Sequence, residues 1–197
     1  VEKSWLGQAP SSESLRPLPA ITPQRIRAVH YDAHESDEVE IYTSLPPTIS
    51  LRDEYLMSIV CDLLASGPFA LLYQRLRTEL GAVYNIRVSL TSPPEPIIIC
   101  YANTQRGNMQ LVEDEYRLAV GKIVAGEYSD ELFDSVINQY RKQLIREKEH
   151  ASLHGCLSNL EDIWLSGDTE TINPFQIINE ANRDSLAQVT TQYLLDK

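Results

Sequence analysis

The spacing of hydrophobic and polar residues changes along the chain, and each change marks an expected element. Residues 1–23 carry scattered prolines and serines without any period, which predicts a linker. Two strands are expected next, near residues 25–31 and 38–45. A capping-box sequence at Ser50 then opens a helix with apolar residues at helical spacing.

A second helix begins near Phe69 and is expected to end at Gly81, where the period changes from 3.6 to 2. The following strand has alternating apolar residues, so Tyr84 and Ile86 are predicted to share one face with Val88 and Leu90. After a proline-rich turn, the fully apolar run at 97–102 predicts the second strand of a hairpin, in a central rather than an edge position.

The rest of the chain is helical in pattern. A helix is expected from about 108 to 125, and Ser129 caps a longer one. Further apolar stripes predict helices around 153–164 and 186–193. Strands that cluster, rather than alternate with helices, predict an α+β fold: a two-layer sandwich of one mostly antiparallel sheet with helices on one face.

Composition narrows the class of protein. The 197 residues are 43% hydrophobic and 23% charged, which is ordinary for a soluble globular protein of one domain or two small ones. A formal net charge of −11 argues against nucleic acid and anionic membrane surfaces as partners. No apolar run is long enough to span a membrane. The compartment stays open between cytoplasm and periplasm, and the start at Val1 leads us to expect processing or excision from a longer polypeptide.

Three cysteines, Cys61, Cys100 and Cys156, fall within apolar helix or strand patterns. They cannot all pair with one another, and residues in such patterns are usually buried. We therefore expect buried free thiols rather than a disulfide framework.

The helix-to-strand corner between Gln74 and Tyr84 carries the most informative chemistry. Arg77 lies in the last turn of the expected helix and Tyr84 early in the strand, so the corner can aim a guanidinium and a phenol at one point. Both groups are strong donors to a polarised carbonyl or an oxyanion. An exposed arginine and a half-buried strand tyrosine fit the same residues and are the default for these residue types.

The segment Arg75-Leu-Arg-Thr-Glu-Leu-Gly-Ala-Val-Tyr84 resembles the hallmark of the second, non-zinc half of the insulinase/pitrilysin zinc metallopeptidases. That family includes the mitochondrial processing peptidases and many bacterial proteases. Supporting patterns precede the motif at 63–69 and follow it at 126–132. The resemblance covers most of the chain, and it favours a bacterial source.

The resemblance implies that residues 24–197 are the C-terminal, substrate-binding half of a zinc metalloendopeptidase, with 1–23 as the hinge segment. In such halves, the arginine and tyrosine that match Arg77 and Tyr84 face the zinc of the other half. They donate hydrogen bonds to the peptide substrate and its tetrahedral intermediate. We expect no catalytic residue and no metal in this segment, and zinc in a companion half on the same polypeptide or on a separate subunit.

Two alternatives stay open beside this reading: a scaffold or assembly subunit, and an independent metal enzyme. The family also contains non-catalytic scaffold or assembly subunits, and an intact His-x-x-Glu-His motif in the companion half would separate a protease from a scaffold. The resemblance also leaves a homo-oligomer open.

Two histidine pairs in this chain, His30/His34 and His150/His154, have the four-residue spacing of that motif but lack its glutamate. Only the second pair could share a helix face, and a zinc site would need further ligands. Surface histidines are the default, and an independent metal enzyme that uses His150 and His154 is the weakest alternative. The chain has no Gly-x-Ser-x-Gly elbow and no glycine-rich phosphate loop.

Overall fold

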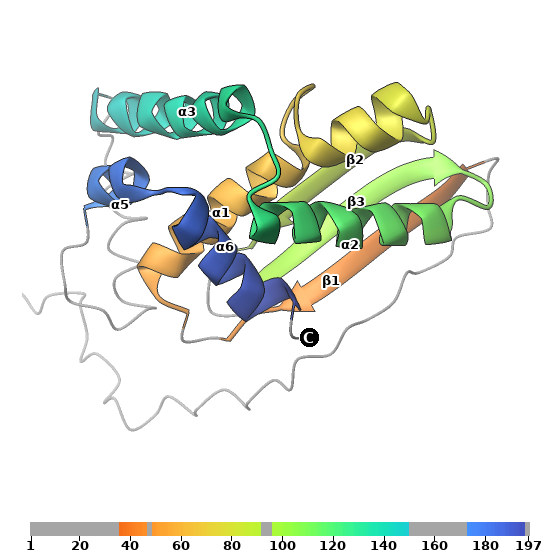
Figure 1. Cartoon of the computed structure of the whole chain (residues 1–197), viewed down its shortest axis with the longest axis horizontal. Coiled ribbons are helices and arrows are strands. Elements are labelled where there is room, and N and C mark those ends of the chain that lie inside the picture. The colour runs from red at the N-terminus through yellow and green to blue at the C-terminus, as the bar shows by residue number, and fades with distance from the viewer. Residues whose placement is uncertain (1–35, 47–48, 92–95, 150–172, 196–197) are drawn as a thin grey trace, which may run out of the picture.

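The computed structural model describes residues 36–46, 49–91, 96–149 and 173–195. They form two layers, with an antiparallel sheet on one side and helices packed on one of its faces (Figure 1). The sheet consists of β1 (Ser36–Ser44), β2 (Val83–Leu90) and β3 (Ile97–Gln105), and β3 lies between the other two. The predicted α+β sandwich and the central position of the apolar strand are both confirmed.

The helical layer contains α-helices and two short π-helices, which are labelled η. Their bounds are α1 Leu51–Ala65, η2 Tyr73–Glu79, α2 Met109–Ala125, α3 Asp130–Glu149, α5 Pro174–Glu180, α6 Arg183–Thr190 and η3 Thr191–Leu195. Several predicted boundaries are confirmed. The Ser50 side chain accepts from the Asp53 amide at the start of α1, and Ser129 accepts from the Leu132 amide near the start of α3. Gly126 takes a left-handed conformation at the end of α2.

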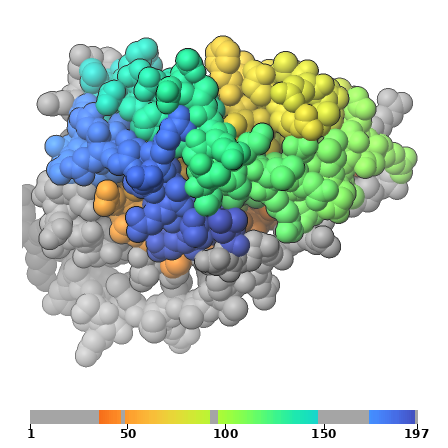
Figure 2. Space-filling model, viewed as in Figure 1, coloured from red at the N-terminus to blue at the C-terminus, as the bar shows by residue number. Residues whose placement is uncertain are grey.

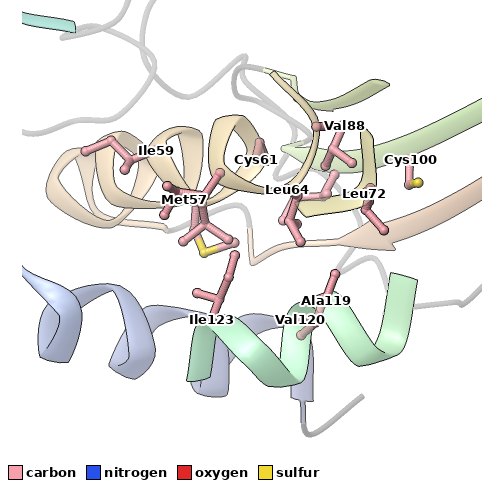
Figure 3. Packing of buried hydrophobic residues seen from close by; sticks show 14 of the residues in the cluster. Met57, Ile59, Cys61, Leu64, Leu72, Val88, Cys100, Ala119, Val120 and Ile123 are labelled. Atoms are coloured by element: carbon pink, nitrogen blue, oxygen red, sulfur yellow. The ribbon is translucent and has the colours of Figure 1, made fainter. Parts of the chain in front are cut away.

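Helix α1 lies at the centre of the molecule and is buried on nearly all sides. Met57 and Leu64 of α1 are fully buried, and Ile123 of α2 and Val88 of β2 pack from the neighbouring elements (Figure 3). Each fully buried side chain of this size contributes about 1.5–3 kcal/mol through removal of apolar surface from water. The core therefore fixes α1, α2 and β2 relative to one another, and α2 and β2 also contact η2, which carries Arg77.

The buried thiols are confirmed for two of the three cysteines. Cys61 of α1 and Cys100 of β3 are buried and free. Burial raises the pKa of the Cys100 thiol to about 12 and raises that of Cys61 as well. These thiols are therefore inert core residues at neutral pH.

Several predicted features lie outside the described residues. They are the linker of residues 1–23, the strand near 25–31, the helix around 153–164, Cys156 and the four histidines of the two pairs. Within the described residues, no helix is long and apolar enough to cross a membrane.

Candidate functional site

Arg77 lies on η2, where the sequence predicts an ordinary helix from Phe69 onward. Phe69 instead lies in a turn with 69% of its surface exposed, and the segment Tyr73–Glu79 is π-helical. The widened turn is visible in its hydrogen bonds, since the Leu80 amide donates to the Arg75 carbonyl at 3.1 Å, five residues back. The predicted regular helix is therefore wrong in type, although it ends where expected.

Gly81 makes the change of direction from η2 to β2. Its φ of +58° lies in the left-handed region, which a residue without a Cβ adopts at low cost. The next residue, Ala82, donates its amide to the Leu76 carbonyl at 2.8 Å and is buried. From the other side, the hydroxyl of the fully buried Thr104 on β3 donates to the Ala82 carbonyl at 2.6 Å. The corner is thus fixed to both the helix and the central strand.

The Arg77 side chain reaches across this corner. Its Nη1 donates to the backbone carbonyl of Tyr84, and its guanidinium carbon lies 5.3 Å from the centre of the Tyr73 ring. The side chain is nevertheless exposed. The tyrosine ring and the carbonyl orient the guanidinium, and its accessible surface can still meet a ligand.

Tyr84 is the extra residue of a β-bulge at the start of β2. Val83 pairs with Thr104 and Asn85 with Asn103, which leaves Tyr84 without an opposite residue on β3. Its side chain is 58% exposed, while Val83 is buried. The predicted shared face of Tyr84 and Ile86 is therefore wrong, because the inserted residue shifts the alternation by one position and turns Tyr84 outward.

Sequence reasoning brought together the two residues of the site but missed part of their surroundings. The Tyr73 ring beneath Arg77 could have been found from its spacing, since residues four apart on a helix are neighbours. The bulge also has a signal, because two apolar residues in succession, Val83 and Tyr84, break the alternation. Arg75 bonds Glu115, forty positions away, and no local pattern predicts that contact.

The described residues do not form a metal site. Among them, no group of three or more histidine, cysteine, aspartate or glutamate side chains could hold a metal ion. The two described cysteines are in the core with pKa values raised by burial, and zinc would require them as thiolates. The residues present at the corner thus suit hydrogen-bond donation rather than metal binding.

A hollow lies at the opposite edge of the sheet from the corner. It has a volume of about 700 Å³ and is lined by β1, α2 and η3, with apolar residues such as Ile41, Met109 and Leu195. Its lining also includes Glu113 and Arg117, but these two side chains form an ion pair with each other at 2.6 Å. We therefore take the corner as the candidate site.

The comparisons with known proteins agree with the motif at this corner. The family model described as the peptidase M16 inactive domain matches residues 1–140. The chain belongs to this family, which confirms the predicted relation to the non-zinc halves of insulinase-type peptidases. No curated protein matches the chain.

Three solved structures illustrate the shared fold. A protease from Helicobacter pylori is similar with a TM-score of 0.71 and 16% identity, over 84% of this chain and 40% of that one. The peptidase M16 inactive domain from Pseudomonas fluorescens has a TM-score of 0.67 and 12% identity, with 90% and 43% covered. The periplasmic protease PqqL from Escherichia coli has a TM-score of 0.66 and 14% identity, with 91% and 20% covered.

The chain spans well under half of each of these three proteins. At such identities the likeness concerns the fold. A single unit of this fold is therefore only part of what those chains contain.

Proposed function

We propose that this chain is the substrate-binding half of a zinc metallopeptidase and that Arg77 and Tyr84 bind the scissile peptide. The observation that carries the proposal is the corner itself, where the Arg77 guanidinium bonds the Tyr84 backbone and both side chains are exposed. Membership of the M16 inactive-domain family supports a role that is not catalytic by itself. The hydrolytic chemistry would belong to a companion half.

The two side chains offer complementary donors. A guanidinium presents five N–H groups in a fixed fork, and one of those of Arg77 is used by the Tyr84 carbonyl. The other N–H groups of the guanidinium can donate hydrogen bonds to a peptide carbonyl of the substrate. The Tyr84 phenol, turned outward by the bulge, can donate a second hydrogen bond to the oxygen on which negative charge develops during peptide hydrolysis.

Such donors become effective only when water is excluded. In water, a hydrogen bond to the substrate replaces one to solvent and gives little net gain, whereas in a closed, low-dielectric chamber it is worth far more. Because both side chains are exposed in this chain, the companion half would have to close over them. Removal of one such donor costs about 2.7–4 kcal/mol of barrier in comparable sites.

The first experiment is a peptidase assay of this chain alone and mixed with its zinc-bearing companion. We expect activity only in the mixture, and we expect Arg77→Ala or Tyr84→Phe to lower it about tenfold or more. Arg87→Ala is the matched control, because Arg87 is an exposed arginine on β2, the strand that carries Tyr84. The Arg87→Ala mixture should hydrolyse the substrate at a rate within about twofold of that of the parent mixture.

Each other outcome has a definite meaning. Activity of this chain alone would contradict the proposal and point to the histidine pairs. A stable but inactive mixture would favour the scaffold alternative, in which the fold serves assembly. An active mixture that tolerates both Arg77→Ala and Tyr84→Phe would show that substrate binding lies elsewhere.

A further inference from the structure

Arg75, two positions before Arg77, ties η2 to a neighbouring helix. Its Nε lies 3.0 Å from Oε1 of Glu115 on α2, and its Nη1 lies 2.9 Å from Oε2 of Glu79 within η2. The Glu115 side chain is only 11% exposed, against 55% for Glu79. The bond to Glu115 is therefore the more sheltered of the two, and it is the one that joins two elements. In Figure 2 the η2 segment (yellow) lies at the surface beside α2 (green).

Three successive residues connect η2 to three different parts of the molecule. Arg75 forms an ion pair with Glu115 of α2, Leu76 is fully buried in the core, and Arg77 donates a hydrogen bond to the Tyr84 carbonyl at the start of β2. π-helical turns are rare, and they are frequently found at functional sites. The position of this turn, and with it the direction of the Arg77 side chain, thus depends on these anchors.

We propose that the Arg75–Glu115 ion pair positions Arg77 for substrate binding, an inference that rests on the proposed function. Without this tie, η2 can shift against α2 and carry the Arg77 guanidinium with it. Donors work only where they meet the place at which charge develops, and a misplacement of about 1 Å can cost as much as a hundredfold in rate. Arg75 and Glu115 act through Arg77 and need not touch the substrate.

Such a role differs from an ordinary contribution to stability. The Arg75 side chain is 44% exposed, and ion pairs with an exposed partner contribute little to the free energy of unfolding. The loss of this pair should therefore be visible in catalysis and nearly absent from thermal unfolding.

The test uses the complete peptidase, with this chain and its zinc-bearing companion, and fluorescein-labelled casein as the probe. Glu115→Gln keeps the shape of the side chain and removes its charge. Glu79→Gln is the matched control, because it takes a carboxylate from the same arginine without cutting the link to α2. Each variant is also made in an Arg77→Ala background, which gives a double-mutant cycle.

We expect Glu115→Gln to lower the rate at limiting substrate about three- to tenfold and Glu79→Gln to lower it less than about twofold. Both should keep the thermal midpoint within about 2 °C of the parent. In the Arg77→Ala background, Glu115→Gln should have no further effect, since the group that it positions is gone.

Three results would overturn the inference. If Glu115→Gln lowers the rate by the same factor in both backgrounds, Glu115 acts independently of Arg77. If it leaves the rate unchanged, or matches Glu79→Gln, the link between η2 and α2 does not position the donor. If Arg77→Ala itself has no effect, the proposed function fails first, and the positioning role fails with it.

Discussion

At the scale of single residues, the corner depends on conformations that few side chains tolerate. Gly81 has a φ of +58°, and an added Cβ there would meet nothing within 4 Å. Any cost of a side chain at this position is therefore in the backbone and not in packing. Gly121, inside α2, is equally unobstructed, but its backbone is helical.

This contrast predicts opposite effects for two identical substitutions. Gly81→Ala should lower the free energy of unfolding by about 1–2 kcal/mol, because a left-handed conformation is unfavourable for an L-residue. Gly121→Ala should raise it by about 0.5–1 kcal/mol, because alanine favours the helix. Urea unfolding of both variants measures the difference. Equal signs would contradict the left-handed conformation of Gly81.

At the scale of elements, the sheet and the helix layer meet at Ala82. Its carbonyl accepts from the Thr104 hydroxyl and, at 3.3 Å, from the Gln105 amide, both at the end of β3. The strand that passes through the middle of the sheet thus supports the first residues of β2. This support involves other residues than the Arg75–Glu115 pair, which links η2 to α2.

A comparison of two buried threonines can distinguish support of the corner from a general contribution to stability. Thr104 and Thr190 are both fully buried and donate to backbone carbonyls, at 2.6 Å and 2.7 Å, but Thr190 bonds Leu186 within α6. Replacement of either by valine should lower the free energy of unfolding by about 0.5–1.5 kcal/mol. Only Thr104→Val should also lower the activity of the assembled peptidase. An equal loss of activity in both variants would mean that the corner has no special dependence on β3.

The sequence allowed prediction of the elements more readily than of their irregularities. The apolar run of β3 and the stripes of α1 and α3 are dictated by burial, so they could be predicted from periodicity. The π-helical turn is accompanied by the contact of Arg75 with Glu115, forty positions away, which no local pattern contains, and the bulge at Tyr84 is marked only by two successive apolar residues. The partnership of Arg77 with Tyr84 was suggested by the resemblance, since a seven-residue spacing by itself fits many structures.

At the scale of the whole molecule, two tyrosine side chains that lie between helices stay neutral at physiological pH. The Tyr193 hydroxyl of η3 donates to the Asp53 carboxylate of α1 at 2.9 Å, which links the end of the described chain to the first helix. Burial and this carboxylate raise the pKa of Tyr193 to about 12. Between α1 and α3, burial and the nearby Asp62 raise the pKa of Tyr140 as well.

These shifts predict that the fold loses stability as the pH becomes alkaline. The unfolded chain ionises its cysteines near pH 9.0 and its tyrosines near pH 10.0, whereas the folded chain holds Cys100 and Tyr193 neutral to about pH 12. The unfolded state therefore binds fewer protons in this window, and each such group lowers the free energy of unfolding by about 1.4 kcal/mol per pH unit.

Urea unfolding between pH 7.5 and 11 would measure this slope. Stability should be nearly constant to about pH 8.5 and then fall, and Cys100→Ala should make the fall shallower from its beginning. Tyr193→Phe should lower stability by a constant amount through loss of the hydrogen bond to Asp53, and it should change the slope only above about pH 10, because an unfolded tyrosine ionises there. A fall that keeps its slope in both variants would mean that groups other than Cys100 and Tyr193 cause the alkaline loss.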